Sequence, residues 1–302
     1  MPRTRETVEL GSSGFALVGV LAFLLVISAL VVPFAVTAKT KLLIANNEIE
    51  HEKLSLLAMG LVNVLSAAVT SGTAANLPLD FSPMRCRADN LLVQAQVQDH
   101  NGLIDLNAAE PPLLALGFAA LGLGPADASK TASTVVAFRN SVSAFSATDV
   151  STDQTSVRGG FKRAPFESVS ELNDIATLSG IPTSRLHGVF TVNSRSGTTS
   201  TLHAPDIVRN TIRANANVAS IVADKSDSRA YTVSVVIRRG ASGLVGDAGY
   251  VIERVGGRDF RLVTRTPALA FDLDSKAADS LGGCDELFGM ETTQILREWA
   301  NG

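Results

Sequence analysis

The sequence predicts an α+β fold in which a long N-terminal helix packs on a small antiparallel sheet and a mainly helical domain is inserted. Three observations predict this fold. An uncharged apolar run near the N-terminus continues as an amphipathic pattern, short helical segments fill the centre, and alternating segments follow near the C-terminus. The chain has 302 residues, enough for one large domain or two ordinary ones.

The composition is that of an apolar, mildly acidic chain. Hydrophobic residues make up 46% of the chain and charged residues 18%, and the mean hydropathy is +0.23, which indicates a membrane segment. The net charge is −3, from 26 Lys and Arg against 29 Asp and Glu. General nucleic-acid binding is therefore disfavoured, because it needs a broad positive field. Two cysteines are too few for a disulfide-dense scaffold or a four-thiolate zinc site.

The run from Phe15 to Ala38 contains no charged side chain and predicts a transmembrane helix. At ~1.5 Å per residue it gives roughly 36 Å of helix, enough to cross a hydrocarbon core of about 30 Å. A polar leader, residues 1–14, precedes it, and Lys39 and Lys41 follow it. Positive charge flanks both ends, so the positive-inside rule does not settle the orientation.

Three interpretations of this run compete. The first is a signal anchor, and the second is a secretory signal cleaved after Val36-Thr37-Ala38, although the run is long for a signal peptide. The third depends on Gly14-Phe15 at the junction of leader and helix. Prepilin peptidases cut at such a junction on the cytoplasmic side and leave the hydrophobic helix attached. A single Gly-Phe pair does not decide among the three.

The helix is predicted to continue beyond the membrane, because no proline occurs between Lys39 and Val69. Apolar residues recur there at three-to-four spacing, typical of an amphipathic helix that packs on a globular head: Ile49, Leu54, Leu57, Leu61, Val64 or Leu65, and Ala68. Together the two parts make one helix of about 55 residues and ~80 Å. Pro33 is a candidate kink. Pilin-like subunits are built in this way.

The alternation of Leu92–Gln98 predicts a half-buried strand, so residues 39–98 are expected to hold the amphipathic helix and the first strand of the head. Asn101-Gly102 predicts a turn. Residues 99–215 then form the inserted, mainly helical domain. Residues 216–302 are expected to hold three antiparallel strands and a tail; the strands are Tyr231–Ile237, Tyr250–Arg254 and Phe260–Thr264, and the tail has a helix through Ile295.

The inserted domain is predicted to contain two helix–turn–helix units. Gly122 and Gly124 lie in the first turn, whereas the second turn has Thr183 in place of its second glycine. Ser168 and Glu171 have the spacing of a capping box at the start of the second unit. Such units resemble helix-hairpin-helix modules, many of which bind DNA by directing backbone amides at a phosphate.

Basic residues near the first hairpin are few, namely Lys130 and Arg139, with Asp127 beside them. We therefore favour a domain that has the hairpin shape without a nucleic-acid role. The alternative, from another functional class, is a membrane-anchored DNA-binding protein of the competence type. A secreted enzyme released by signal peptidase is a third alternative, but no site residues support it.

The order of these parts resembles the K-class minor pseudopilin of type II secretion, also called general secretion pathway protein K. The resemblance extends from about Gly14 to Thr266. It rests on Gly14-Phe15 and on the segments Asp99–Ala109, Ala164–Leu172, Leu178–Pro182, Phe190–Val192 and Tyr231–Val235. The stretches that begin at Asn101 and at Ala164 are its most specific parts. After the second helix of the inserted domain the chain departs from the family, which often has an Asp-Trp-Arg-Asp-like stretch there, whereas this chain has Phe138–Ser141.

The resemblance implies a pseudopilin fold with an inserted helical domain, cleavage between Gly14 and Phe15, and N-methylation of Phe15. It implies a single pass through the inner membrane with a periplasmic head and a leader that is cytoplasmic before cleavage. The implied partners are prepilin peptidase, the major pseudopilin and other minor pseudopilins, with no nucleic acid. The implied assembly helix contains Gly19, Pro33, Leu54, Leu57 and Leu61.

Gly19 carries a specific expectation. Most pilin-like proteins have a Glu five residues into the mature helix, where it pairs with a neighbour's N-terminus, but this chain has Gly19. The K class characteristically lacks that Glu, which fits a subunit at the filament tip with no neighbour above it. A buried carboxylate without a partner would be costly.

No catalytic or metal site is predicted, and no cofactor. The chain has no zinc-hydrolase motif, phosphate-binding loop or Gly-x-Ser-x-Gly elbow. The four histidines are scattered and are expected to be solvated or to form local hydrogen bonds: His51, His100, His187 and His203. Calcium is associated with pseudopilin heads, but Asp149 and Asp153 lack the acidic spacing of a calcium loop, so calcium stays unassigned.

Cys86 and Cys284 would face an oxidising compartment if the head is periplasmic. Joined, they would close a loop of about 200 residues, worth on the order of 5 kcal/mol in the chain-entropy model. The sequence leaves open whether they meet.

Overall fold

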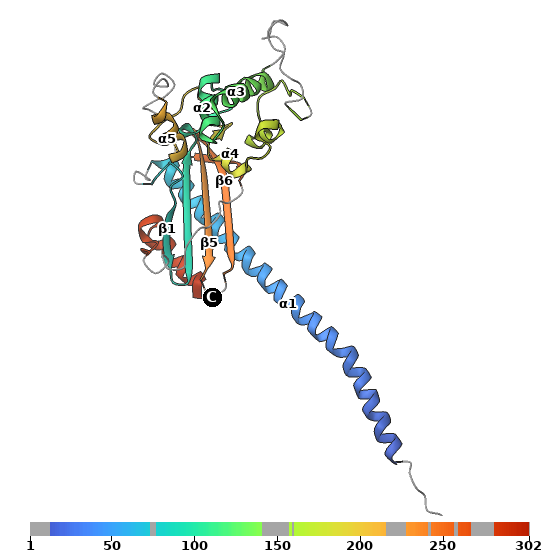
Figure 1. The fold of residues 1–302 in the computed structure, drawn as a ribbon. Helices are drawn as coiled ribbons and strands as arrows, with labels where there is room; N and C mark the ends of the chain where they lie inside the picture. Colours follow the sequence, from blue (N-terminus) through green and yellow to red (C-terminus); the bar gives the residue numbers. More distant parts are fainter. Residues whose placement is uncertain are drawn as a thin grey trace, which may run out of the picture. The chain divides into compact units, whose positions relative to one another are not determined.

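The computed structural model describes residues 13–72, 77–140, 157–158, 160–215, 228–240, 243–256, 259–266 and 281–301 (Figure 1). Residues 1–52 and residues 53–302 form two compact units, and each is described by itself. The described part of the chain combines one long helix, an antiparallel sheet and a group of shorter helices. The predicted α+β class is therefore confirmed.

The N-terminal helix α1 (Ser13–Ser71) has 59 residues. Pro33 lies inside it and does not end it, and the Thr37 hydroxyl donates to the Pro33 carbonyl at 2.8 Å. Ile49, predicted to lie on the packing face, is exposed. In the second unit, the predicted face is buried at Leu54, Leu57 and Leu61, and their neighbours on the same stripe are also buried: Ala58, Val62, Leu65 and Val69.

The sheet has five antiparallel strands in the order β1-β2-β5-β6-β7 (Figure 1). They are β1 (Met84–Ala88), β2 (Leu91–Asp99), β5 (Ala230–Arg239), β6 (Val245–Gly256) and β7 (Asp259–Arg265). The last three form the predicted meander. The strand predicted as the first one is β2. The edge strand β1 precedes it unpredicted, because its alternation extends over only five residues.

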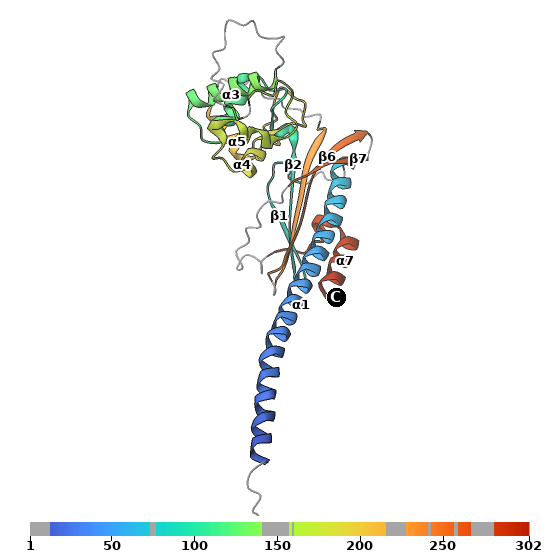
Figure 2. The ribbon, with the colours of Figure 1, turned by 90° about the vertical axis from the view of Figure 1, so that its right-hand side faces the viewer.

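One face of this sheet packs against α1 and the C-terminal helices α6 (Asp285–Phe288) and α7 (Met290–Asn301), which lie on the same side in Figure 2. The register places Val93 of β2 between Cys86 of β1 and Ile237 of β5, and all three point into this core. The buried apolar residues of the tail are Cys284, Phe288, Leu296 and Ala300. The tail therefore completes the core of the sheet domain.

The strand β2 is more buried than its alternation predicts. Gln94 and Gln98 point away from the α1 face, and both are buried. Arg85 on the neighbouring strand donates from Nε to Gln94 Oε1 at 3.0 Å, and Gln98 Nε2 donates to the carbonyls of Asp99 and His203. A half-buried strand is thus the wrong prediction, because neighbouring polar groups cover these glutamines.

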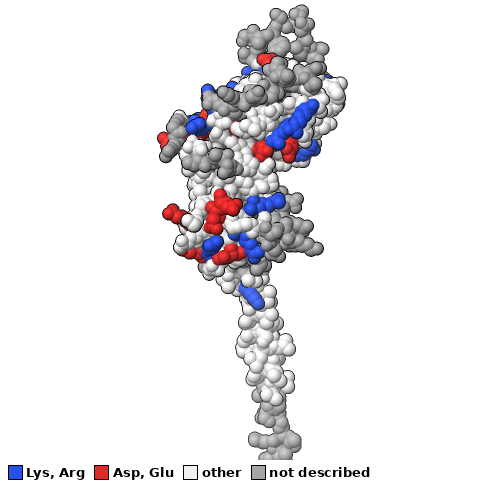
Figure 3. Space-filling view, turned by 90° about the vertical axis from the view of Figure 1, so that its left-hand side faces the viewer, with Lys and Arg blue, Asp and Glu red and all other residues white. Residues whose placement is uncertain are grey.

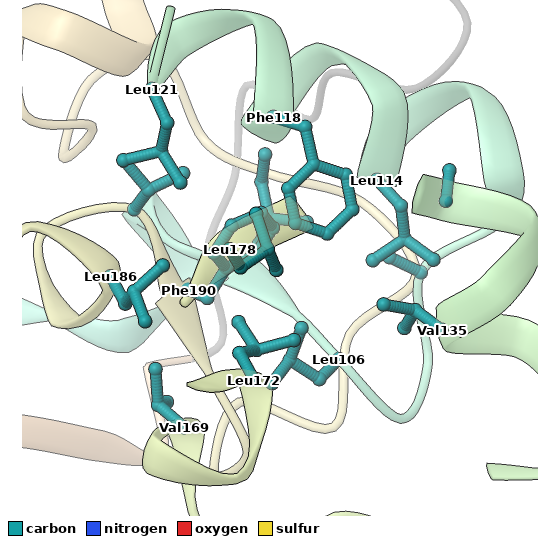
Figure 4. Close-up of a cluster of buried hydrophobic side chains, with 14 of the residues drawn as sticks. Leu106, Leu114, Phe118, Leu121, Val135, Val169, Leu172, Leu178, Leu186 and Phe190 are labelled. Carbon is teal, nitrogen blue, oxygen red and sulfur yellow. The ribbon is translucent and has the colours of Figure 1, made fainter. Parts of the chain in front are cut away.

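A second core belongs to the helical region between β2 and β5. Its helices are α2 (Pro111–Ala120), α3 (Pro125–Arg139), α4 (Thr183–His187) and α5 (Asp206–Ala214), with short 3-10 turns η1 (His100–Gly102), η4 (Val169–Asp174) and η5 (Ala176–Leu178). The strands β3 (Ile104–Asp105) and β4 (Phe190–Thr191) pair in parallel. Figure 4 shows apolar side chains of α2, α4, η4 and β4 converging in this core. The rings of Phe118 and Phe190 lie 4.8 Å apart.

The two predicted helix–turn–helix units differ in kind. Helices α2 and α3 form the first, with Gly122 at a φ of 97° between them. The second unit opens with η4, a 3-10 helix, although its predicted capping box is present: Ser168 accepts from Ser170 N, and Glu171 accepts from the Ser168 amide. The capping box therefore begins a short 3-10 helix, a form that is common in short pieces of chain.

A glycine sets the distance between α1 and the sheet. A Cβ built on Gly246 would lie 2.3 Å from the Leu54 carbonyl carbon, which is backbone and cannot move aside. Gly60, on the same helix, has open space around its Cα.

We expect Gly246→Ala to lower the free energy of unfolding by about 2 kcal/mol, because the added methyl forces helix and strand apart. Gly60→Ala should raise it by about 1 kcal/mol, because alanine favours an exposed helix position. Thermal unfolding of the detergent-solubilised chain measures both. Equal midpoints for the two variants would show that the helix and the sheet do not make this close approach.

Candidate functional site

The first candidate site is the apolar part of α1. Its described side chains from Leu17 onward are exposed, and the most apolar 18-residue window has a mean hydropathy of 2.8 with none of it buried. On the face that Figure 3 shows, the described residues of this part of the helix carry no charge. By length and composition, it is the one described helix that could cross a membrane. So large an apolar surface needs lipid or other helices around it.

The predicted processing pair, Gly14 and Phe15, lies in the first turn of α1, and its side chains fall outside the described residues. Gly19 follows one turn later, and a Cβ there would meet nothing within 4 Å. The position where most pilin-like proteins carry a glutamate is therefore open and uncharged.

A disulfide joins the tail to the sheet domain. Cys86 of β1 and Cys284, at the start of α6, are bonded across 198 residues of sequence, with their Cα atoms 4.9 Å apart. Both are buried in the core beneath α1. Further contacts fix the far end of α7: Asn90 donates to the Ala300 carbonyl, and Asn301 donates to Asp89.

A buried carboxylate lies where the chain passes from the sheet into the inserted domain. Asp99 is fully buried and accepts from His203 Nδ1 at 2.6 Å, from the Ser228 hydroxyl and from the Asn101 amide at 2.9 Å. Burial alone would raise the pKa of Asp99. The hydrogen bonds from His203, Ser228 and Asn101 outweigh it and hold that pKa below its usual value.

The next residue, His100, is also buried. Its Nδ1 lies 2.7 Å from the Thr191 hydroxyl of β4, and its Nε2 lies 2.8 Å from the Thr232 hydroxyl of β5. Burial lowers the pKa of His100 to about 4, against a smaller opposing attraction from Asp99. The expectation of local hydrogen bonding holds for His100 and His203, whereas His51 is exposed on α1.

The geometry around the first hairpin does not favour phosphate binding. Arg139 donates to the carbonyls of Leu106 and Ala109, so its guanidinium supports the inserted domain internally. Partial burial lowers the pKa of Arg139. Lys130 is exposed on α3 and lies beside the acidic first turn that holds Asp127. In the described part of this hairpin, one exposed lysine does not make the basic surface that a DNA backbone needs.

Among the residues that the structure describes, no group of three or more His, Cys, Asp or Glu side chains is arranged to hold a metal ion. Asp149 and Asp153 of the predicted polar loop lie outside the described residues. A shallow hollow of about 450 Å³ lies at the end of α1, lined by residues that include Val69, Leu79, Leu202 and His203. Its lining is largely apolar, and Asp80 and His203 are its titratable side chains.

The structure brings together several residues that sequence reasoning kept apart. Asp99 and His203 are 104 positions apart in sequence, and Cys86 and Cys284 are 198 apart. The sequence signals for these two contacts were the presence of two cysteines and the polar residues at the end of an apolar strand. Neither signal identifies which partner folds back onto which strand.

Comparisons with known proteins support the fold. No protein-family model matches the chain, and no curated protein matches it in sequence. Among solved structures it is similar to a chain of the GspK-GspI-GspJ complex from the type 2 secretion system of enterotoxigenic Escherichia coli. The match has a TM-score of 0.54 and 10% sequence identity, and it covers 75% of this chain and 100% of that chain. The predicted pseudopilin-type fold is thereby confirmed.

We expect the double variant Cys86→Ala/Cys284→Ala to lower the free energy of unfolding by about 3 to 5 kcal/mol, because the bond closes a very long loop. Loss of the bond should also expose α7 to trypsin at Arg297. Timed proteolysis followed by mass spectrometry measures this cleavage. Ile295→Ala, at an exposed position of the same helix, serves as the control and should cut at the wild-type rate. Unchanged cleavage in the double variant would mean that the bond does not hold the tail.

Proposed function

We propose that the chain is a minor pseudopilin of the K class, which stands at the tip of a type II secretion pseudopilus and nucleates its assembly. The observation that carries this proposal is the fold it shares with a chain of the GspK-GspI-GspJ complex, over the whole length of that chain. The subunit acts by packing, not by catalysis.

The proposal includes processing and a location. Prepilin peptidase removes residues 1–14 and the new N-terminus, Phe15, is methylated. The apolar part of α1 then crosses the inner membrane once, and the head lies in the periplasm. Two features support this: the exposed apolar stretch needs a non-aqueous environment, and the disulfide Cys86–Cys284 is typical of an oxidising compartment.

The proposed partners are other minor pseudopilins and the major pseudopilin, with no nucleic acid. The apolar part of α1 offers the contact surface, because it exposes large side chains in a continuous stretch. Helices that associate in lipid do so by close packing rather than by further burial from water. Calcium stays unassigned.

Co-purification tests the proposed partnership. The full chain is co-expressed with the other minor pseudopilins of its own gene neighbourhood, extracted in detergent and captured through a tag. Leu25→Lys in the apolar stretch should lose the partners, because it places a charge on the contact surface. Leu202→Lys is the matched control, since both leucines are 70% exposed, and it should keep them. Wild-type chain that captures no partner, or loss with both variants, would contradict the proposal.

Gly19→Glu tests the tip position. At the tip no neighbour supplies a positive N-terminus, so a carboxylate here costs about 3 kcal/mol in the membrane. We expect Gly19→Glu to reduce secretion in a strain that lacks the native gene, and Gly19→Ala to restore secretion fully. Secreted protein in the medium, normalised to the membrane level of each variant, is the measurement. Full secretion with Gly19→Glu would argue against the tip.

A further inference from the structure

A buried polar layer separates the two apolar cores of the head. The chain enters the inserted domain after Asp99 and returns to the sheet at Ala230, and these connections adjoin because Asp99 pairs with Tyr231. The residues at this junction are polar and buried: Gln98, Asp99, His100, Asn101 and Thr191. On one side of the layer lies the core of the inserted domain, around Phe118. On the other side lies the core of the sheet, around Val93.

His100 is the residue that spans this layer. Its two ring nitrogens bond to hydroxyls on opposite sides, Thr191 in the inserted domain and Thr232 in the sheet. A neutral imidazole offers one donor and one acceptor, and a hydroxyl can serve either. A protonated ring would carry a charge that faces two hydroxyls in an enclosed site. Such a charge is costly to bury.

The charged and titratable groups around His100 offset that charge only in part. Asp99 adjoins it in sequence, but its carboxylate already accepts hydrogen bonds from His203, Ser228 and Asn101. His187 of α4 also faces His100, and as a cation it would repel a protonated ring. Other ties also cross the junction. His203 bonds to the Asp99 carboxylate, and its carbonyl accepts from Gln98. The ion pairs Arg209–Asp80 and Arg195–Glu253 are partly exposed and therefore weak.

We propose that His100 is an acid-sensitive latch between the inserted domain and the sheet, so that its protonation releases the two parts from each other while each apolar core stays folded. This opening differs from general acid unfolding, because protonation acts on the polar junction and not on the two apolar cores. The two cores contain apolar side chains that do not titrate.

The sign of the pH dependence follows from the burial of His100. The pKa of His100 is about 4 in the closed state and returns toward 6.5 when the ring reaches water. Protons therefore bind the open state more tightly. The latch is fully effective above about pH 6.5, and its effect is lost as the pH falls toward 4.

Distance measurement between spin labels tests the latch. Labels are attached at Asp127→Cys on α3 and Glu298→Cys on α7, both exposed positions, in the full chain in detergent with the native disulfide intact. We expect one narrow distance distribution at pH 7 and a longer, broader one at pH 4 that narrows again on neutralisation. A distribution unchanged down to pH 4 would overturn the proposal.

Two variants separate the latch from other titrations. His100→Gln keeps a neutral donor and acceptor, so its distribution should stay narrow at both pH values. His187→Gln removes a different half-buried histidine whose pKa is also lowered by burial, and it should still open. Opening of His100→Gln at the wild-type pH would overturn the proposal.

If His100→Gln does not fold, NMR titration of the wild-type His100 ring replaces it. The midpoint of that titration should coincide with the midpoint of the distance change. Separate midpoints would equally overturn the proposal.

Discussion

The structure depends on the fact that α1 needs two different environments along a single helix. Its first part presents apolar side chains all round and is covered by nothing in the described chain, whereas its stripe at Leu54, Leu57 and Leu61 is buried against the sheet. A helix satisfies its own backbone hydrogen bonds, so a single helix can continue from a protein core into lipid. The sheet, the close approach at Gly246 and the C-terminal helices all serve to hold that stripe.

The head is held together by different chemistry at its two ends. Near the tail, a buried disulfide and apolar packing fix α6 and α7 on the sheet, and neither depends on protonation. Toward the inserted domain, the contact is made by Asp99, His100 and their hydroxyl partners. Apolar contacts resist changes in pH, whereas buried polar networks depend on the charge state of each member. The contact between the inserted domain and the sheet is therefore the part of the head that depends on pH.

The local pattern of apolar residues predicted helices and strands, but it did not predict which residues far apart in sequence meet. The period of the apolar residues predicted the buried stripe of α1 and the C-terminal meander, because burial on one face leaves a readable repeat. It missed β1, whose partner is set by the register with β2. It also missed the meeting of Asp99 with His203, since polar residues in a junction carry no period. The capping box at Ser168 was predicted correctly, but it begins a 3-10 helix and not the predicted α-helix.

The most direct test of the pseudopilin account is the intact mass and N-terminal residue of the protein isolated from its native membrane. The account predicts a chain that begins at N-methylated Phe15 and retains the disulfide. A chain that begins at Lys39 would be a released protein without its apolar helix, and an intact Met1 would be an unprocessed anchor. Either of these two results would contradict the proposed place of α1 in a filament.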